Sequence, residues 1–248
     1  MRKYNNYILL LVSDVILSVF HWCSCNLKII DNHKMLNDHE DLFLSLLCDN
    51  GGYEWRRSFM VIYIIPFILG VMFICSYDEK IISIIRLRSR KHFIKKYFQS
   101  LLICAVIFAF THEIVNLIGM KIFFTDELLL KYNMPAYTAL NIVIITMFCL
   151  KVGLIFQLYK IYVPGAVSVI MTLVTYCTIF YSVAVFPAIA KLNFSARDCS
   201  VIYYLVSGTI TVRTYLIILF KSMIIMLILL WLCCVFYQQK DILENEKK

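Results

Sequence analysis

Six apolar segments constrain this chain more than any other feature of its sequence. A helix that crosses the hydrocarbon of a bilayer needs about 20 consecutive apolar residues, and each segment approaches that length. A soluble chain of 248 residues could bury so much apolar surface only by exposing large apolar patches elsewhere. The expected spans cover residues 6–21, 59–76, 101–119, 138–156, 164–187 and 214–237.

The composition points to the same class of protein. Hydrophobic residues make up 61% of the chain and charged residues only 16%, well below the roughly 25% typical of soluble domains. This excludes a soluble enzyme, a disordered chain and a disulfide-stapled secreted domain. We expect an all-α, polytopic integral membrane protein with one transmembrane domain over residues 1–248, an outer loop over 22–58 and a cytoplasmic loop over 78–99.

The net charge of +8 predicts an orientation in the membrane. If the N-terminus is cytoplasmic, the inner segments hold 13 basic and five acidic residues, whereas the outer loops hold nine of each. Short cytoplasmic loops carry an excess of Lys and Arg. We therefore expect a multi-pass protein of the cell membrane with both termini cytoplasmic. Its charge is explained without a nucleic-acid partner.

The expected cytoplasmic loop over 78–99 has the most informative pattern. Apolar residues recur at helical spacing on both sides of a basic run, Arg86–Lys91. This predicts a short amphipathic helix, a basic elbow and a second amphipathic stretch that leads into the third span. Two interpretations stay open: an anchor that lies on anionic membrane lipid, or a docking helix for a cytoplasmic partner.

The layout of six spans with both ends inside, together with the stretch Ile84–Phe98 (IIRLRSRKHFIKKYF), resembles type-2 ABC transporter permeases. The resemblance is to small six-span permeases of Gram-positive bacteria that serve bacteriocin or peptide export, or immunity. In that family this loop is the coupling helix that sits in the ATP-binding subunit. The resemblance implies the following coupling residues here: Ile84, Ile85, Arg86, Arg88, Arg90, Lys91 and Phe93.

The same resemblance implies a permease subunit of an ATP-driven exporter that moves an amphipathic or antimicrobial peptide, or a lipid-like substrate, out of the cell. It also implies a second permease copy or a paralogue as the other membrane half. The sequence has no G-x-x-x-x-G-K-[ST] motif, so ATP and Mg are expected in a separate subunit and this chain is not expected to be an enzyme. The alternative is a non-transporting accessory or immunity protein that binds a partner.

Four charged residues fall inside the expected spans, where such residues are functional candidates. At 1.5 Å per residue, Asp14 and Lys151 lie about 10–12 Å from the inner edge, and Glu113 and Lys221 about 10–12 Å from the outer edge. The matched depths and opposite signs predict two internal ion pairs that fix the register of the helices. The alternative places these groups along a substrate path.

The pair His112-Glu113 invites comparison with zinc peptidases, which place two histidines four residues apart on one helix. Position 116 is Asn rather than His, so the sequence predicts no metal site.

Three cysteines fall in the expected outer loop or at its edge. A disulfide from Cys48 to Cys23 or Cys25 would pin this loop, since the outer compartment permits oxidation. The alternative is that all of them are reduced.

Overall fold

The computed structural model describes residues 2–33, 42, 43, 64–84, 90–185, 205, 208 and 210–239. Helices account for 94% of this part of the chain, and it holds no strand. The prediction of an all-α protein is therefore confirmed for the described residues.

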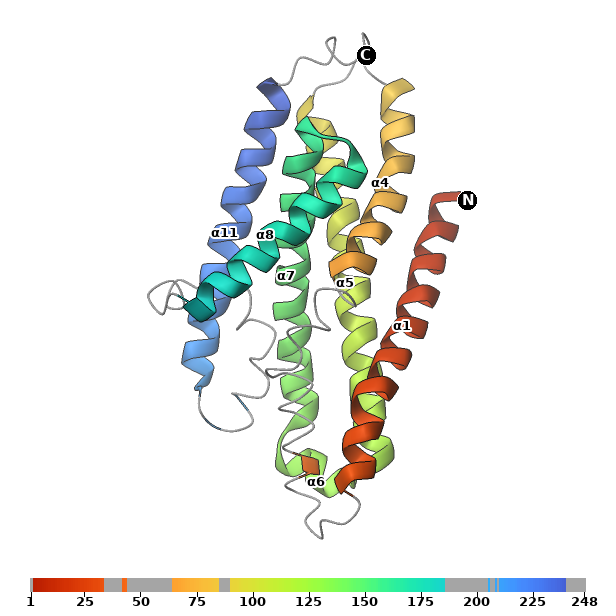
Figure 1. Ribbon diagram of the computed structural model, residues 1–248, viewed down its shortest axis with the longest axis vertical. Helices are drawn as coiled ribbons and strands as arrows, with labels where there is room; N and C mark the ends of the chain where they lie inside the picture. Colours follow the sequence, from red (N-terminus) through yellow and green to blue (C-terminus); the bar gives the residue numbers. More distant parts are fainter. Residues whose placement is uncertain are drawn as a thin grey trace.

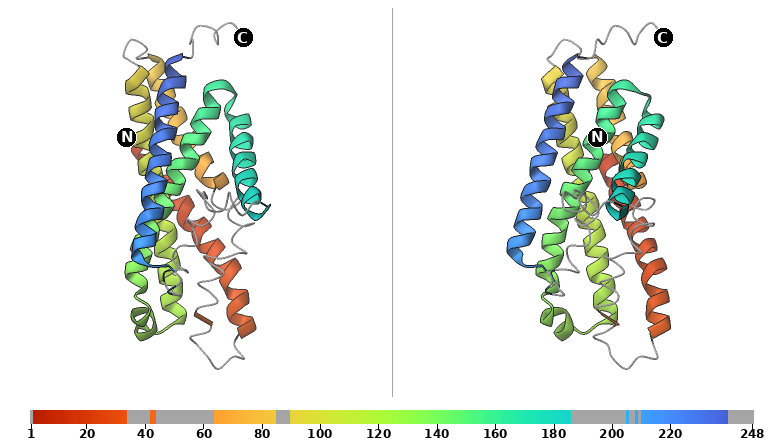
Figure 2. Two further views of the ribbon diagram at one scale, coloured as in Figure 1. Left: turned by 90° about the vertical axis from the view of Figure 1, so that its left-hand side faces the viewer. Right: turned by 60° about the vertical axis from the view of Figure 1, so that its left-hand side comes forward.

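Seven helices make up the described structure (Figure 1). Helices α5 and α7 pack along each other in the middle, and α1, α4, α8 and α11 surround them. Figure 2 shows α8 and α11 on different sides of α7. The bounds are Arg2–His33 for α1, Ile65–Ile84 for α4, Arg90–Phe123 for α5, Asp126–Lys131 for α6, Met134–Tyr162 for α7, Gly165–Val185 for α8 and Val212–Gln239 for α11.

Four helices are long and apolar enough to cross a membrane. Their apolar stretches are Asn5–Ser24, Phe93–Phe123, Met134–Tyr162 and Val212–Tyr237, and they coincide with the first, third, fourth and sixth expected spans. The second and fifth expected spans fall on α4 and α8, where the apolar helical stretches among the described residues are shorter: Ile65–Ile74 and Gly165–Ile179. The number of six spans therefore stays a prediction.

The expected amphipathic coupling helix is not a separate element in the described residues. Helix α4 continues through Ile84, and α5 begins at Arg90. The flanks of the expected loop are therefore continuations of two long helices. The physical reason is that neither Gly nor Pro occurs between Val71 and Ile118, so no residue of either kind breaks the helices near the basic run.

The turn between α5 and α7 is specified locally. The side chain of Thr125 caps α6 by accepting a hydrogen bond from the backbone N–H of Leu128, and Asp126 and Glu127 occupy the first turn, where acidic groups complement the helix dipole. Asn133 then adopts a left-handed conformation with φ of 50° and begins α7. These residues reverse the chain, so α7 runs antiparallel to α5.

Close approach of α5 and α7 depends on Gly153. A Cβ atom at this position would overlap the side chain of Leu101 on α5, which is fully buried. The buried carbonyl oxygen of Gly153 accepts a hydrogen bond of 2.8 Å from the Tyr97 hydroxyl. Small residues at helix contacts allow this kind of approach in membrane proteins.

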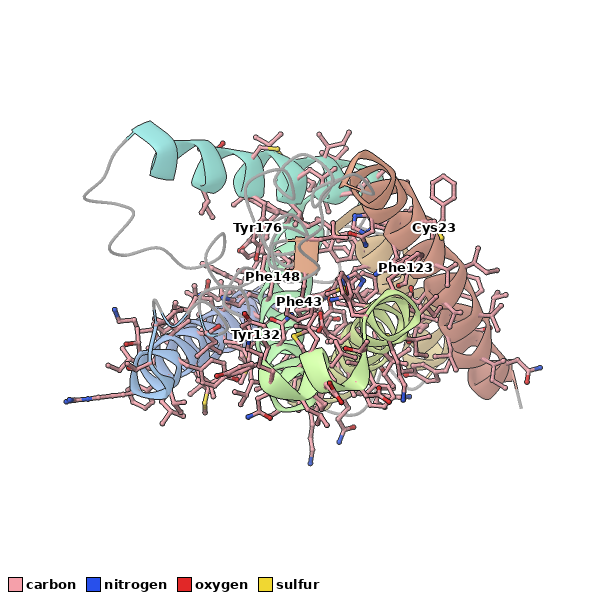
Figure 3. All side chains as sticks on the ribbon, turned by 90° about the horizontal axis from the view of Figure 1, so that it is seen from below. Cys23, Phe43, Phe123, Tyr132, Phe148 and Tyr176 are labelled. Atoms are coloured by element: carbon pink, nitrogen blue, oxygen red, sulfur yellow. The ribbon has the colours of Figure 1, made fainter. Side chains whose placement is uncertain are left out.

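A second apolar cluster closes the opposite end of the bundle, beside α6. It combines Trp22 of α1 with Phe43, Met120, Phe124, Leu129 and Met134. The Phe43 ring stacks on Tyr132 at 5.1 Å, and the two labels lie side by side in Figure 3. The Trp22 ring stacks on Phe123 at 5.5 Å, and this contact fastens α1 to α5 near their C-terminal ends.

The contact at Gly153 gives a direct prediction. Gly153→Ala should lower the free energy of unfolding in detergent by about 1–2 kcal/mol, because overpacking a filled core outweighs the gain in helix propensity. Reaction of a maleimide dye with the buried thiols of Cys104 and Cys149 during heating would report the unfolding.

Gly165→Ala is the matched control. A Cβ there would meet only the terminal methyl of Met72, at 3.2 Å, which has a flexible side chain. Its effect should stay within about 0.5 kcal/mol. Equal losses for the two variants would contradict the assigned role of Gly153.

Candidate functional site: buried polar residues between α1, α5 and α7

Helix α1 buries a row of polar residues against the other helices and exposes many of its apolar residues. Asp14, Ser18 and His21 follow helical spacing and are buried, and Asp14 is only 3% exposed. Ile16 and Phe20 lie on the other side of the helix, with 63% and 71% exposure. A helix on the surface of a soluble protein has the opposite arrangement. Polar residues that face the interior and apolar residues that face outward are typical of membrane helices.

The inward face of α1 meets polar residues of α5. The rings of His21 and His112 lie 6.1 Å apart, centroid to centroid, with an angle of 58° between their planes. Glu113 follows His112 and is 2% exposed. Two elements far apart in sequence therefore bring two imidazoles and a carboxyl group to one region of the bundle.

Helix α7 supplies the hydrogen-bond partner of this carboxyl group. The side-chain nitrogen of Asn141 donates a hydrogen bond of 2.9 Å to Oε1 of Glu113. The second carboxyl oxygen of Glu113, Oε2, and the side-chain oxygen of Asn141, Oδ1, are buried and have no hydrogen-bond partner in the structure. The site therefore has two acceptor atoms that remain available to a hydrogen-bond donor.

This arrangement corrects the predicted pairing of Glu113 with Lys221. Glu113 points between α5 and α7 to Asn141, whereas the Lys221 side chain is exposed on α11. Depth along a span was estimated from the sequence, but the direction of each side chain around its helix depends on how the helices pack.

The second predicted ion pair joins Asp14 of α1 to Lys151 of α7. Asp14 and Lys151 are both buried, at 3% and 2% exposure. Oδ2 of Asp14 is buried without a hydrogen-bond partner. An ion pair between Asp14 and Lys151 stays a prediction.

A metal centre has no counterpart in the described part of the chain. No three His, Cys, Asp or Glu side chains among these residues come together in a group that could hold a metal ion. His21 stands beside His112, but Asn116 occupies the next turn of α5. These three side chains together with Glu113 form a polar cluster rather than a recognisable zinc shell.

The expected coupling residues that the structure describes lie at one end of the bundle. Ile84 ends α4, Arg90 and Lys91 begin α5, and the C-terminal ends of α7 and α11 lie at the same end (Figure 1). Ile85, Arg86 and Arg88 lie outside the described residues.

Phe93 differs from the other expected coupling residues. It is buried, and its ring stacks on Tyr237 of α11 with 4.7 Å between centroids and 11° between planes. Within this chain Phe93 is therefore a packing residue that joins α5 to α11. The prediction that a cytoplasmic partner binds this region now depends on the basic residues of the run Arg86–Lys91.

Of the three outer cysteines, the structure describes the thiol of Cys23 only. That thiol is free and partly buried, and the residue is labelled in Figure 3. The pairing of Cys48 with Cys23 stays a prediction, because Cys48 lies outside the described part of the chain. The side chain of Cys25 and the whole of Cys48 lie outside the described part, and so does the pairing between them.

Asn141 and the contact between His21 and His112 were not predicted from the sequence. Asn141 could have been found, because it is a polar residue inside the apolar segment 138–156 and such residues pack inward and bond across helices. The contact of the two histidines has no such signal, since 91 positions separate them along the chain.

The fold and this site define an all-helical protein whose long apolar helices suit a membrane and whose polar groups are packed inside. No family model matches the chain, and no curated protein or solved structure is significantly similar to it.

The bond between Glu113 and Asn141 predicts measurable coupling. Asn141→Leu should lower the free energy of unfolding by about 1–2 kcal/mol, because it leaves a buried carboxyl group without its donor. The double variant Glu113→Leu/Asn141→Leu should lose less than the sum of the two single variants. Thermal unfolding in detergent would measure the coupling.

Lys221→Met is the control variant for this double-mutant comparison of Glu113 and Asn141. Combined with Glu113→Leu it should give additive losses within about 0.5 kcal/mol, since residues without shared contacts behave independently. Coupling of Glu113 to Lys221 that equals its coupling to Asn141 would contradict the observed geometry.

Proposed function

We propose that this chain is the membrane-spanning permease subunit of an ATP-driven ABC exporter. Its cargo would be an amphipathic or antimicrobial peptide, or a lipid-like molecule, moved out of the cell. The chain would lie in the cell membrane with both termini in the cytoplasm.

The observation that carries this proposal is the position of the basic run in the fold. Ile84 ends α4 just before the run in sequence, and Arg90 and Lys91 of the run begin α5, at the end of the bundle that also holds the C-terminal ends of α7 and α11. Force applied at this point would act directly on two long helices, because α5 continues from Arg90 to Phe123 without a break. A partner that binds here would thus be mechanically joined to the centre of the bundle.

The energy source in this proposal is a separate ATP-binding subunit. This chain has no phosphate-binding loop of the Walker type. The basic run would bind acidic groups of the ATP-binding subunit, and movement of α5 would reach the interior through its contacts with α1 and α7. ATP and Mg belong to the partner in this arrangement.

The interior suits a cargo that is partly polar. Oε2 of Glu113, Oδ1 of Asn141 and Oδ2 of Asp14 are buried acceptors without hydrogen-bond partners in the structure. Opening of the bundle would expose these atoms to donor groups of an amphipathic cargo. The surrounding apolar side chains would contact its apolar part.

A second function is favoured by a different observation. His112 and Glu113 are 9% and 2% exposed, so the polar residues are closed off in this conformation. A closed bundle suits an accessory or immunity protein that binds a partner without moving a cargo.

Charge reversal in the basic run tests the proposal. Arg88→Glu/Arg90→Glu should release the ATP-binding subunit during gentle purification, with at least about a tenfold loss of the co-purified subunit, because attraction to acidic groups becomes repulsion. Quantitative mass spectrometry and ATPase assays of the purified complex would measure the loss.

Lys121→Glu is the matched control, since Lys121 is an exposed basic residue of the same helix at its opposite end. It should leave the complex intact. Retention of the ATPase by the double reversal would disprove coupling through the basic run. Purification of the chain without any ATPase would favour the accessory protein.

A further inference from the structure

Lys221 is an exposed charge on an otherwise apolar helix. Its neighbours three and four residues away along α11 are Ile217, Ile218, Ile224 and Ile225. The helix contains no Asp or Glu between Val212 and Gln239, so it offers no partner for the ammonium group. The structure shows no ion pair or hydrogen bond of Lys221 with any other described part of the chain.

The position of Lys221 along α11 is well inside a bilayer. The helix has 28 residues and is about 42 Å long, compared with a hydrocarbon thickness of about 30 Å. When the helix is centred, the Lys221 backbone lies about 7–8 Å inside the hydrocarbon, counted from the N-terminal end of the helix. Ionised side chains within the hydrocarbon are usually paired inside a bundle, or, for a Lys near a helix end, extend the stem to the lipid headgroups.

The face that carries Lys221 is exposed, and no described helix covers it. Phe220 is 65% exposed and Trp231 is 63% exposed, and α11 packs on α7 and more weakly on α5. Tyr215, on the inner side of α11, is buried and its hydroxyl donates a hydrogen bond to the carbonyl oxygen of Leu140. The packing of α11 against α7 therefore fixes the outward position of Lys221.

We infer that the Lys221 face of α11, defined by Ile217, Phe220, Lys221, Ile224 and Ile228, is an interface for a different membrane protein whose transmembrane helix presents an Asp or Glu at the depth of Lys221. The apolar side chains supply the contact area, and the ion pair fixes the register of the two helices. This interface holds whether the chain transports a cargo or only binds a partner.

The choice of a different chain over a second copy follows from charge. Within the described helices of this chain that are long and apolar enough to span, the carboxyl groups in the apolar core are Asp14 and Glu113, and both are buried between α1, α5 and α7. A second copy would therefore present the same lysine on its α11 and keep Asp14 and Glu113 inside. Two α11 helices face to face would place like charges together, which is unfavourable.

The test is a cross-link of zero length in membranes of the cells that make this protein. Dicyclohexylcarbodiimide is apolar and enters the bilayer, where it converts a carboxyl group into an O-acylisourea. The neutral Lys221 amine displaces dicyclohexylurea from this adduct and loses a proton, so one amide bond forms and the carboxyl oxygen leaves in the urea. Peptide mass spectrometry would then identify the two residues that the amide joins.

The expected product joins Lys221 to an Asp or Glu within an apolar segment of another polypeptide. Lys221→Met should abolish the amide and reduce co-purification of that polypeptide by about tenfold or more. Lys221→Arg should retain the polypeptide without the amide, because the charge remains but the amine is lost. Arg213→Met, which removes a cation from the first turn of the same helix, should change neither result.

Two results would overturn the inference. An amide to a second copy, recognised by mixing isotopically labelled and unlabelled chains, would replace the partner with this protein itself. Absence of the amide, together with unchanged co-purification in Lys221→Met, would show a lysine that extends its stem to the lipid headgroups. Because Lys221→Met makes α11 more apolar, the variant should still insert and fold.

Discussion

Hydrogen bonding inside a medium without water is the constraint on which the rest of this structure depends. In hydrocarbon, a polar group has no solvent partner, so it must find one inside the protein or remain unpaired at a cost. The polar side chains of α1 accordingly turn toward α5, and Glu113 accepts a hydrogen bond from Asn141 across two helices. The outer surface is left to apolar side chains such as Phe20.

The arrangement of polar side chains inside and apolar side chains outside determines which interactions hold the helices together. Because apolar side chains outside gain nothing from leaving lipid, the helices are held by close contact and by bonds between helices. Gly153 provides both, since it has no side chain and its carbonyl oxygen accepts the Tyr97 hydroxyl. The hydroxyl of Tyr215 and the thiol of Cys233 bond to backbone oxygens of α7 in the same way. Helix α7 therefore holds α5, α8 and α11, whereas α1 and α4 pack mainly on α5.

The fold class could be read from the sequence because the length of an apolar segment alone indicates a membrane helix. The ends of such segments were less certain, since α4 and α5 continue past the expected edges of their spans into the basic loop. The candidate site was predicted in part. Glu113 and Asp14 stood out as charges in apolar segments, but the partners of Glu113 depend on rotation about each helix axis, which composition does not record.

The sequence by itself determined that the chain is helical, apolar and basic at its expected inner segments, because these properties follow from residue type and local spacing. Only the tertiary structure decided that the His21 ring lies beside the His112 ring, that Asn141 donates a hydrogen bond to Glu113 and that Lys221 is exposed on α11. The reason is physical. A residue's depth follows from counting along the chain, whereas its neighbour is fixed by how α1, α5, α7 and α11 turn their faces to one another.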